Sequence, residues 1–383
     1  MLYDKLKEYT ESEVYPMHMP GHKRNPRHSG LRAAIPSGLP YDIDITEIYG
    51  FDDLQDPRSI LKEAAELAET LYGSDKAFLL INGSTVGILS AIGAHAKRGD
   101  KVLVHSNCHR SVYNAIDLFG LSAASITPET DEATDILCSV SPAAIEKALD
   151  GDPAIKLVVV TSPTYEGVIS DIRSISEVAR SHGVPLIVDS AHGAHLGFSK
   201  EFPYSAVQEG ADVVVMSLHK TLPALTQCSL LHVCSRFANT GEISRLLSVL
   251  QTSSPSYILM ASIDTCLRVL NSDNEKLFSE YARNLECFDS EIKSLKNLTV
   301  LCHGSDAPHP GFYAFDPGKL VISAKKHTLS GQMLANALRK EYKIELERAC
   351  ENHAIAMTSV CDSPEGFSRL ANALLSIDDS QCK

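Results

Sequence analysis

The sequence predicts an α/β protein with a mostly parallel sheet, helices on both faces of that sheet, and a small C-terminal α+β part. Short apolar runs of strand length alternate with helical patterns, as a parallel sheet covered by helices requires. After about residue 235 this alternation gives way to long helical stretches, and short strands and helices follow from residue 297. A sheet of this kind binds its ligand beyond the carboxyl ends of its strands.

The candidate strands are runs with the length and apolar character of buried strands. They cover residues 77–81, 101–105, 155–161, 185–189, 212–216 and 229–233. Helical patterns lie between them, and several begin at plausible caps, such as Ser141 before Pro142. These patterns cover residues 85–97, 109–119, 142–149 and 171–182.

The C-terminal half begins with long helical patterns over residues 240–251 and 256–296. The last helix is well marked, because Ser363 can cap it and Pro364 suits its first position. Phe367, Leu370, Leu374 and Ile377 then recur on one face. We therefore predict an irregular N-terminal arm over 1–50, a large domain over 51–296 and a small α+β domain over 297–383.

The composition is that of a soluble globular protein. The chain has 383 residues, of which 44% are hydrophobic and 22% charged. Its formal net charge of −13 argues against a nucleic-acid partner, which requires clustered Lys and Arg. No stretch approaches the roughly 20 apolar residues of a membrane helix or resembles a signal peptide, so we expect a cytoplasmic protein without a membrane partner. The ten cysteines have no paired spacing, which favours reduced thiols.

Two predicted strand ends carry polar groups that pyridoxal 5′-phosphate needs. Asp189 closes the run 185–189, and Lys220 follows the run 212–216 after a short polar turn. A lysine amine can form a Schiff base with the cofactor, and a carboxylate beside the pyridine nitrogen keeps this nitrogen protonated, so that the ring accepts electrons. Strand-end Asp and Lys residues also occur in α/β proteins without such chemistry, so the pair alone leaves a structural role open.

A third strand end adds a candidate phosphate site. Asn82-Gly83-Ser84-Thr85 follows the run 77–81, and a helical pattern begins there. Backbone N–H groups and hydroxyls at such a turn point toward an anion at the helix N-terminus. Ser84 and Thr85 are therefore candidate phosphate ligands, although Ser and Thr also cap helices that bind no ligand.

Short motifs in a fixed order extend over residues 16 to about 265. They are Met19–Lys23 (MPGHK), Asp44–Gly50 (DITEIYG), Asp52–Leu54 (DDL), Asn82–Thr85 (NGST), His109–Val112 (HRSV), Ser162–Tyr165 (SPTY), Asp189–His195 (DSAHGAH), Ser217–Lys220 (SLHK) and Thr252–Tyr257 (TSSPSY). Together they resemble the ornithine/lysine/arginine decarboxylase family of pyridoxal-phosphate enzymes. By this resemblance we expect a compact form, without an N-terminal wing domain and with a shortened C-terminal region.

The resemblance implies the type I pyridoxal-phosphate-dependent transferase fold and assigns roles to single residues. Lys220 would bond to the cofactor as an aldimine, Asp189 would pair with the pyridine nitrogen, and His109 would stack on the ring. His109 could instead serve only as a helix cap. The other implied cofactor contacts are Ser84, Thr85, Ser217 and His219 around the phosphate, and Ala191 and His192 along the pocket.

The implied reaction is α-decarboxylation of lysine, arginine or ornithine, which releases cadaverine, agmatine or putrescine and so belongs to polyamine biosynthesis. The family's active sites form between two subunits, which implies a homodimer. An aminotransferase or lyase reaction on the same fold, or cofactor binding without turnover, are the alternatives. A basic substrate needs an acidic group at the far end of its pocket, and the candidates are Glu47, Asp52, Asp53, Glu345 and Glu347.

Some positions suggest other chemistry or depart from the family. His192 and His195 have a spacing that two metal ligands can share, but no third ligand is evident, so we predict no metal site. Ser190 stands where many members carry Glu, and Cys350 stands where an Asp is often seen. The string Ile344–Glu347 resembles a strand of the family's small domain.

Overall fold

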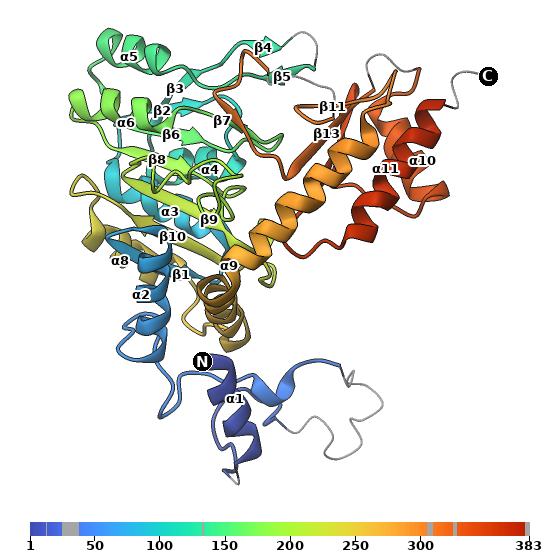
Figure 1. The fold of residues 1–383 in the computed structure, drawn as a ribbon. Helices are drawn as coiled ribbons and strands as arrows, with labels where there is room; N and C mark the ends of the chain where they lie inside the picture. Colours follow the sequence, from blue (N-terminus) through green and yellow to red (C-terminus); the bar gives the residue numbers. More distant parts are fainter. Residues whose placement is uncertain (13, 25–37, 132–133, 305–308, 325–327, 380–383) are drawn as a thin grey trace.

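A seven-stranded sheet forms the centre of the larger part of the molecule (Figure 1). The computed structural model describes residues 1–12, 14–24, 38–131, 134–304, 309–324 and 328–379. The strand order is β1 (Lys76–Leu80), β10 (Ser229–Val233), β9 (Val213–Ser217), β8 (Leu186–Asp189), β6 (Ile155–Thr161), β2 (Lys101–His105) and β3 (Ser122–Ile126). Strand β10 is antiparallel to both neighbours, and all pairs from β9 to β3 are parallel. The predicted sheet is confirmed.

Helices cover both faces of this sheet because its central strands are apolar on both sides. Every residue of β8 and β9 is buried. Successive side chains point to opposite faces, so Val188 belongs to one core and Ile187 to another. The first core includes residues of α2 (Ile60–Tyr72), α5 (Pro142–Gly151) and α6 (Ile172–Ser181), and the second includes residues of α3 (Gly83–His95), α4 (Arg110–Phe119) and α8 (Thr240–Leu250).

Gly87 allows α3 to lie unusually close to the sheet. A Cβ atom at this position would lie 2.7 Å from Leu80 Cδ1 and 2.8 Å from Val215 Cγ1. Any larger residue would push the helix away from the strands. This close packing sets the distance between α3 and the sheet, and it places the N-terminus of α3 beside the carboxyl ends of the strands.

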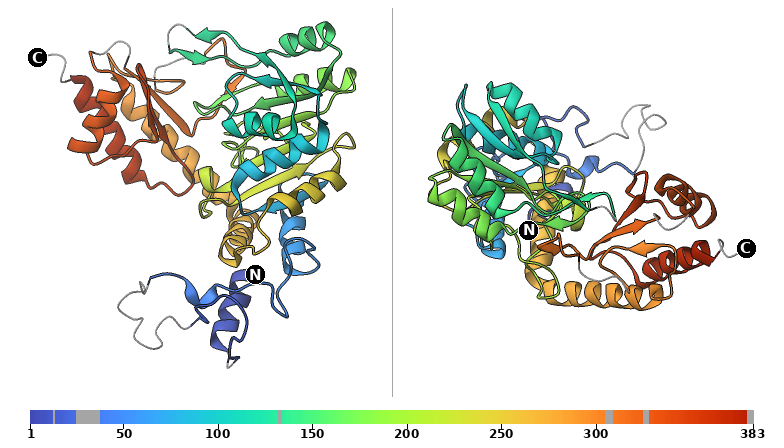
Figure 2. Two further views of the ribbon diagram at one scale, coloured as in Figure 1. Left: turned by 180° about the vertical axis from the view of Figure 1, so that it is seen from behind. Right: turned by 90° about the horizontal axis from the view of Figure 1, so that it is seen from above.

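One long helix, α9 (Tyr257–Ile292), leads from the larger part to a smaller C-terminal part (Figures 1 and 2). Phe288 of α9 packs edge-on against Phe367, with ring centroids 6.1 Å apart. The carboxylate of Asp378 accepts three successive backbone N–H groups after α9, the first from Lys296. The smaller part contains the antiparallel strands β11 (Thr299–Val300), β13 (Lys319–Ser323), β15 (His353–Met357) and β14 (Arg348–Ala349), with helices α10 (Gly331–Glu341) and α11 (Pro364–Asp379).

The strand expected at residues 344–347 is found directly after them, as β14 (Arg348–Ala349). Helix α10 ends through Lys343, which has a positive φ of 58°, and the Ile344 N–H bonds back to the Leu338 carbonyl at 3.0 Å. The first of these residues lead out of the helix, and hydrogen bonding to β15 begins at Glu347, whose N–H donates to the Ile355 carbonyl at 3.0 Å directly before β14. Two short ribbons complete the strands, β4 (Thr130–Asp131) with β5 (Ile136–Leu137), and β7 (Val168–Ile169) with β12 (Ala314–Phe315).

The segment expected to be an irregular N-terminal arm begins with a helix. Leu2–Glu11 form helix α1, whose Leu2 and Leu6 are fully buried. The Leu2 N–H donates to Asp264 of α9 at 2.8 Å, which ties the helix to the body of the molecule. Only two apolar positions are buried among many charged residues, so the helical pattern is hard to see in the sequence. A single 3-10 turn, η2 (Tyr41–Ile43), follows.

The described part of the chain contains neither a candidate membrane-spanning helix nor a disulfide. Within the described residues, no helix is both long enough and apolar enough to span a bilayer. No disulfide joins the cysteines of the described residues, and Cys382 lies outside these residues. Cys228 and Cys266 are buried in the core, where a thiol packs as a small apolar group.

Candidate active site

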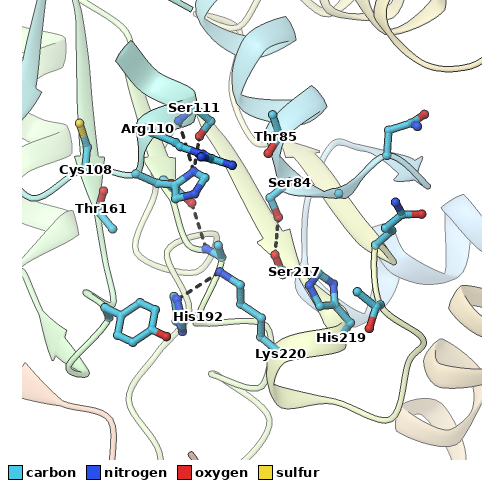
Figure 3. A pocket seen from close by; sticks show the side chains of 18 of the residues that line it. Ser84, Thr85, Cys108, Arg110, Ser111, Thr161, His192, Ser217, His219 and Lys220 are labelled. Carbon is cyan, nitrogen blue, oxygen red and sulfur yellow. Dashed lines mark hydrogen bonds between the residues drawn. The ribbon is translucent and has the colours of Figure 1, made fainter. Parts of the chain in front are cut away.

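The carboxyl ends of β6, β8 and β9 open into a cavity of about 650 Å³ (Figure 3). Thr161, Asp189 and Ser217, the last residues of these strands, all line it. This is the edge at which an α/β sheet binds ligands, and the volume suits a small-molecule site. All predicted site residues line the cavity: Ser84, Thr85, His109, Asp189, Ala191, His192, Ser217, His219 and Lys220.

Asp189 and Lys220 present a carboxylate and an amine to the same cavity. Asp189 is 2% exposed, and its Oδ1 accepts the Ala191 N–H at 3.2 Å. Burial raises the pKa of Asp189, while the charges of Lys220 and His109 oppose this shift. Lys220 lies in the one-turn helix α7 (Leu218–Thr221), and burial lowers its pKa. Both shifts favour the neutral forms of the two groups.

The N-terminus of α3 forms a cradle of hydroxyl and N–H groups. Gly83 begins the helix with a positive φ of 74°, which a side chain would disfavour. The Ser84 Oγ lies 2.5 Å from the Ser217 Oγ and 3.3 Å from the Ser229 Oγ, while Thr85 is exposed. His219 Nδ1 donates to the Cys228 carbonyl at 3.0 Å, which fixes the imidazole at the cavity wall. Such a helix start, lined by hydroxyls, suits a phosphate group.

His109 is a helix cap whose ring also lines the cavity. It is the N-cap of α4, where its Nδ1 accepts the Ser111 N–H at 3.3 Å and lies 2.9 Å from the Ser111 Oγ. The imidazole also lines the cavity, close enough to Asp189 for their charges to interact. Burial lowers the pKa of His109, which favours a neutral ring. The cap therefore holds the ring at the wall, and stacking on a cofactor stays a prediction.

His192 and His195 have separate partners. His192 Nε2 lies 3.1 Å from Lys220 Nζ, and its Nδ1 lies 2.8 Å from Lys319 Nζ (Figure 3 shows the first contact). His195 Nε2 instead lies 3.0 Å from Asp316 Oδ1. The described residues contain no group of three side chains that could hold a metal ion. Only His192 of the pair lines the cavity.

Several cavity residues were not predicted. Tyr165 closes the quoted motif SPTY, so its place in a motif was the available signal. Arg348 comes from the small C-terminal part, and Lys319 contacts His192 from the same part, where the sequence carries no signal that they meet a site over a hundred residues earlier. The other unpredicted lining residues are Asn82, Gly83, Asn107, Cys108, Arg110, Ser111, Thr161, Thr226 and Gln227.

The candidate carboxylates for a basic substrate lie in different surroundings. Burial alone would raise the pKa of Asp52, but backbone N–H groups at the start of α2 donate to it and lower its pKa, so Asp52 is a helix cap. Glu345 forms an exposed ion pair with Arg339. Glu347 instead accepts the hydroxyl hydrogen of Tyr165, which lines the cavity. Of these three, Glu347 is the one next to the cavity.

The donor set fits pyridoxal 5′-phosphate. The hydroxyl-rich start of α3 suits its phosphate, the buried carboxylate of Asp189 suits a protonated pyridine nitrogen, and the Lys220 amine suits its aldehyde. These groups line one cavity at the carboxyl ends of β1, β8 and β9. Ser190, the departure from the family's Glu, is fully buried outside the cavity lining and leaves this set intact.

The comparisons with known proteins agree with this assignment. Residues 1–365 match the family model described as Orn/Lys/Arg decarboxylase, major domain. The chain is 37% identical over 382 residues to "Uncharacterized protein YaaO" of Bacillus subtilis, which covers 99% of this chain and 77% of that protein. It is 32% identical over 377 residues to an arginine decarboxylase of Bacillus subtilis, which covers 98% of this chain and 76% of that enzyme.

Among solved structures, the Francisella novicida lysine decarboxylase has a TM-score of 0.85 to this chain at 19% identity. The match covers 98% of this chain but 59% of that one, so the chain spans less than two thirds of that enzyme. This likeness shows a shared type I pyridoxal-phosphate fold. With the family match over 1–365, the chain belongs to the Orn/Lys/Arg decarboxylase family of pyridoxal-phosphate enzymes.

Proposed function

We propose that this enzyme decarboxylates a basic amino acid, namely arginine, lysine or ornithine, at its α-carbon. Family membership and the relatives named arginine decarboxylase support the proposal. Within the site, the main support for the proposal is Glu347. Its carboxylate accepts a hydrogen bond from the Tyr165 hydroxyl at the cavity wall, and its charge raises the pKa of Lys220. A cationic side chain that enters the cavity would find a counter-charge there.

The cofactor, when bound, withdraws electrons from the α-carbon bonds of an attached amino acid. The residues of the chain determine how this capacity is used. Asp189 can keep the pyridine nitrogen protonated, and the start of α3 can hold the phosphate. His109 and His192 can fix the plane of the ring from the cavity wall. The bond that breaks is the one held perpendicular to this plane, so substrate orientation selects the reaction.

A panel of amino acids tests the proposed function. Carboxyl-labelled arginine, lysine, ornithine, glutamate and leucine are each incubated with the cofactor-loaded enzyme, and carbon dioxide and amine are measured. Release of both from at least one basic amino acid, and from neither of the others, is the expected result. Release from none, or transfer of the amino group to a keto acid, would overturn the proposal in favour of another reaction on the same fold.

The Glu347→Gln variant should bind the preferred basic substrate more weakly. An exposed charge pair contributes up to about 1 kcal/mol, so KM should rise roughly threefold to fivefold, with a smaller change in kcat. The uncharged amide keeps an oxygen that can accept the Tyr165 hydroxyl, so the wall itself should remain in place. Steady-state kinetics on the same amino acids measure the effect.

Glu345→Gln is the matched control. Glu345 is also exposed and lies only two positions earlier, but it pairs with Arg339 on the surface. Its replacement should leave KM unchanged. Equal effects of the two variants, or no effect of Glu347→Gln, would remove Glu347 from the recognition of the substrate.

We also propose that the enzyme is a homodimer with active sites at the subunit interface. The N-terminal part supports this, because it extends away from the central sheet (Figures 1 and 2). It exposes large apolar side chains that a second copy could cover: Tyr15 is 71% exposed, Met17 85%, Met19 68% and Tyr49 104%. One chain has a mass of 41.6 kDa, and light scattering should give twice this value. The mass of a single chain would contradict a dimer.

A further inference from the structure

A second lysine lies beside the candidate active site, buried behind its wall. Lys319, the first residue of β13, is 1% exposed, and its Nζ lies 2.8 Å from His192 Nδ1. A buried ammonium is costly unless it has a partner. Burial lowers the pKa of Lys319 to about 8, while the charge of Asp316 opposes this shift. Asp316, in the turn directly before Lys319, favours the charged form of this amine.

The backbone around Lys319 is shaped to admit this side chain. Gly167 has a positive φ of 103°, and a Cβ atom there would lie 2.7 Å from both Cβ and Cγ of Lys319. Asp316 Oδ1 accepts the Gly318 N–H at 2.9 Å, and the Lys319 N–H donates to the Asp316 carbonyl at 3.0 Å. The turn before β13 and the turn before β7 thus close around one lysine and direct it toward His192.

His192 stands between two amines, since its other nitrogen, Nε2, lies 3.1 Å from Lys220 Nζ. An ammonium can only donate, so a charged Lys319 requires a lone pair at Nδ1 of His192. A neutral imidazole then carries its proton on Nε2. That N–H can be donated to Lys220 only if Nζ of Lys220 has a lone pair, which means that Lys220 is a neutral amine.

Burial and the charge of Lys319 agree with a neutral His192. Burial lowers the pKa of His192 well below its usual value, and the charge of Lys319 lowers it further, so its ring is neutral. Burial alone would raise the pKa of Asp316, but His195 and Lys319 lower it, so Asp316 is an anion that can balance a charged Lys319. Burial lowers the pKa of Lys220 against the opposing charges of Asp189 and Glu347. The pKa of Asp189 is itself raised, which makes it a poorer counter-ion for Lys220.

We propose that Lys319 is a positioning residue that acts through His192 to hold Lys220 as the neutral amine, the form that can bond to the aldehyde of the cofactor. This inference rests on the cofactor chemistry of the proposed function, with Lys220 as the bonding lysine. The titratable groups that act on the two bridging side chains are, for Lys319, Asp316, Lys220, Glu347 and Glu166, and for His192, Lys319, Lys220, His195 and His109. The Tyr165 ring also contacts His192, with centroids 5.0 Å apart.

The proposal is tested by measuring how fast the cofactor-free enzyme forms its covalent bond to pyridoxal 5′-phosphate after the cofactor is added. The visible absorbance that accompanies the bond is followed by stopped flow across a range of pH. In Lys319→Met the midpoint of the pH profile should move up by about one unit, and the rate at neutral pH should fall roughly tenfold, because less Lys220 is neutral. Lys319→Arg keeps the charge and should restore most of the rate. Lys340→Met, which removes an exposed lysine of α10, should match the wild type.

Nitrogen NMR of the cofactor-free wild type gives a second readout that needs no folded variant at position 319. The His192 signals are assigned by their absence from His192→Gln, and they should show a proton on Nε2 and a bare Nδ1. A proton on Nδ1, or an unchanged pH profile in Lys319→Met, would overturn the role of Lys319. If the wild type forms no borohydride-stable bond to Lys220, the cofactor assignment itself has failed, whatever the NMR shows.

Discussion

The Lys220→Ala variant should lose the visible absorbance of the cofactor-bound enzyme, and its decarboxylation rate should fall by roughly three orders of magnitude or more. Lys220 is the lysine that lines the cavity in the part of the chain that the structure describes. Burial lowers its pKa, so a larger fraction of its amine is neutral and able to attack an aldehyde. Without this amine the cofactor can be held only by its phosphate and ring contacts.

Borohydride reduction followed by peptide mapping identifies the bonded lysine directly. The wild type should carry the reduced adduct on Lys220, and Lys220→Ala should carry none. Lys276→Ala, which removes an exposed lysine of α9, should behave as the wild type. Lys319, which contacts the other ring nitrogen of His192, is the candidate substitute amine. Unchanged absorbance in Lys220→Ala with an adduct on Lys319 would transfer the bonding role to Lys319.

The parts of the site that follow from the sequence are those that lie at strand ends. Two of these residues, Asp189 and Ser217, are the last residues of buried strands, and the turn containing Ser84 follows another strand. Parallel strands bring their carboxyl ends to one edge of the sheet. Local signals of length and apolar character are therefore sufficient to place them together. The motifs add which chemistry the cluster carries, and the family match agrees with them.

Other features depend on contacts that no local pattern records. Lys319 begins an apolar run and reads as an ordinary strand residue, yet its side chain reaches His192 because β13 is brought against the turn at Gly167. Strand β3 was not predicted, since its sequence of small and polar residues is stabilised only by pairing with β2 at the sheet edge. Helix α1 depends in the same way on burial of Leu2 against α9.

The Asp189→Asn variant should still bind the cofactor but lose most of its turnover. An amide cannot keep the pyridine nitrogen protonated, so the ring becomes a weaker electron acceptor, and kcat should fall roughly a hundredfold or more. Binding should change less, because the start of α3 and Lys220 still hold the cofactor. Titration of the visible absorbance measures binding, and carbon dioxide release measures turnover. Turnover equal to that of the wild type would rule out Asp189 as the group that controls the ring.

Asp212→Asn is the control for removing a buried carboxylate from this sheet. Asp212 is fully buried just before β9, at the opposite edge from the cavity, where its Oδ2 accepts the Leu186 N–H at 2.8 Å and Arg180 pairs with it at 3.2 Å. Its replacement should lower the stability of the protein, because it breaks this paired network. The kcat of the folded enzyme should stay near that of the wild type, which separates a structural loss from a catalytic one.

The same Asp189→Asn variant should stabilise the cofactor-free protein near neutral pH. Burial raises the pKa of Asp189 above the value of 3.8 expected in the unfolded chain. A raised carboxyl pKa gives stability that is complete below that unfolded value and is lost as pH rises through the folded pKa. Asn cannot ionise and so avoids this loss. Melting temperatures of the two cofactor-free proteins should therefore converge near pH 4 and separate toward about pH 8, with the variant higher. A difference that does not change with pH would mean that Asp189 is ionised in the empty site at no cost, with Lys220 as its counter-ion, and Lys220 would then be a cation before the cofactor binds.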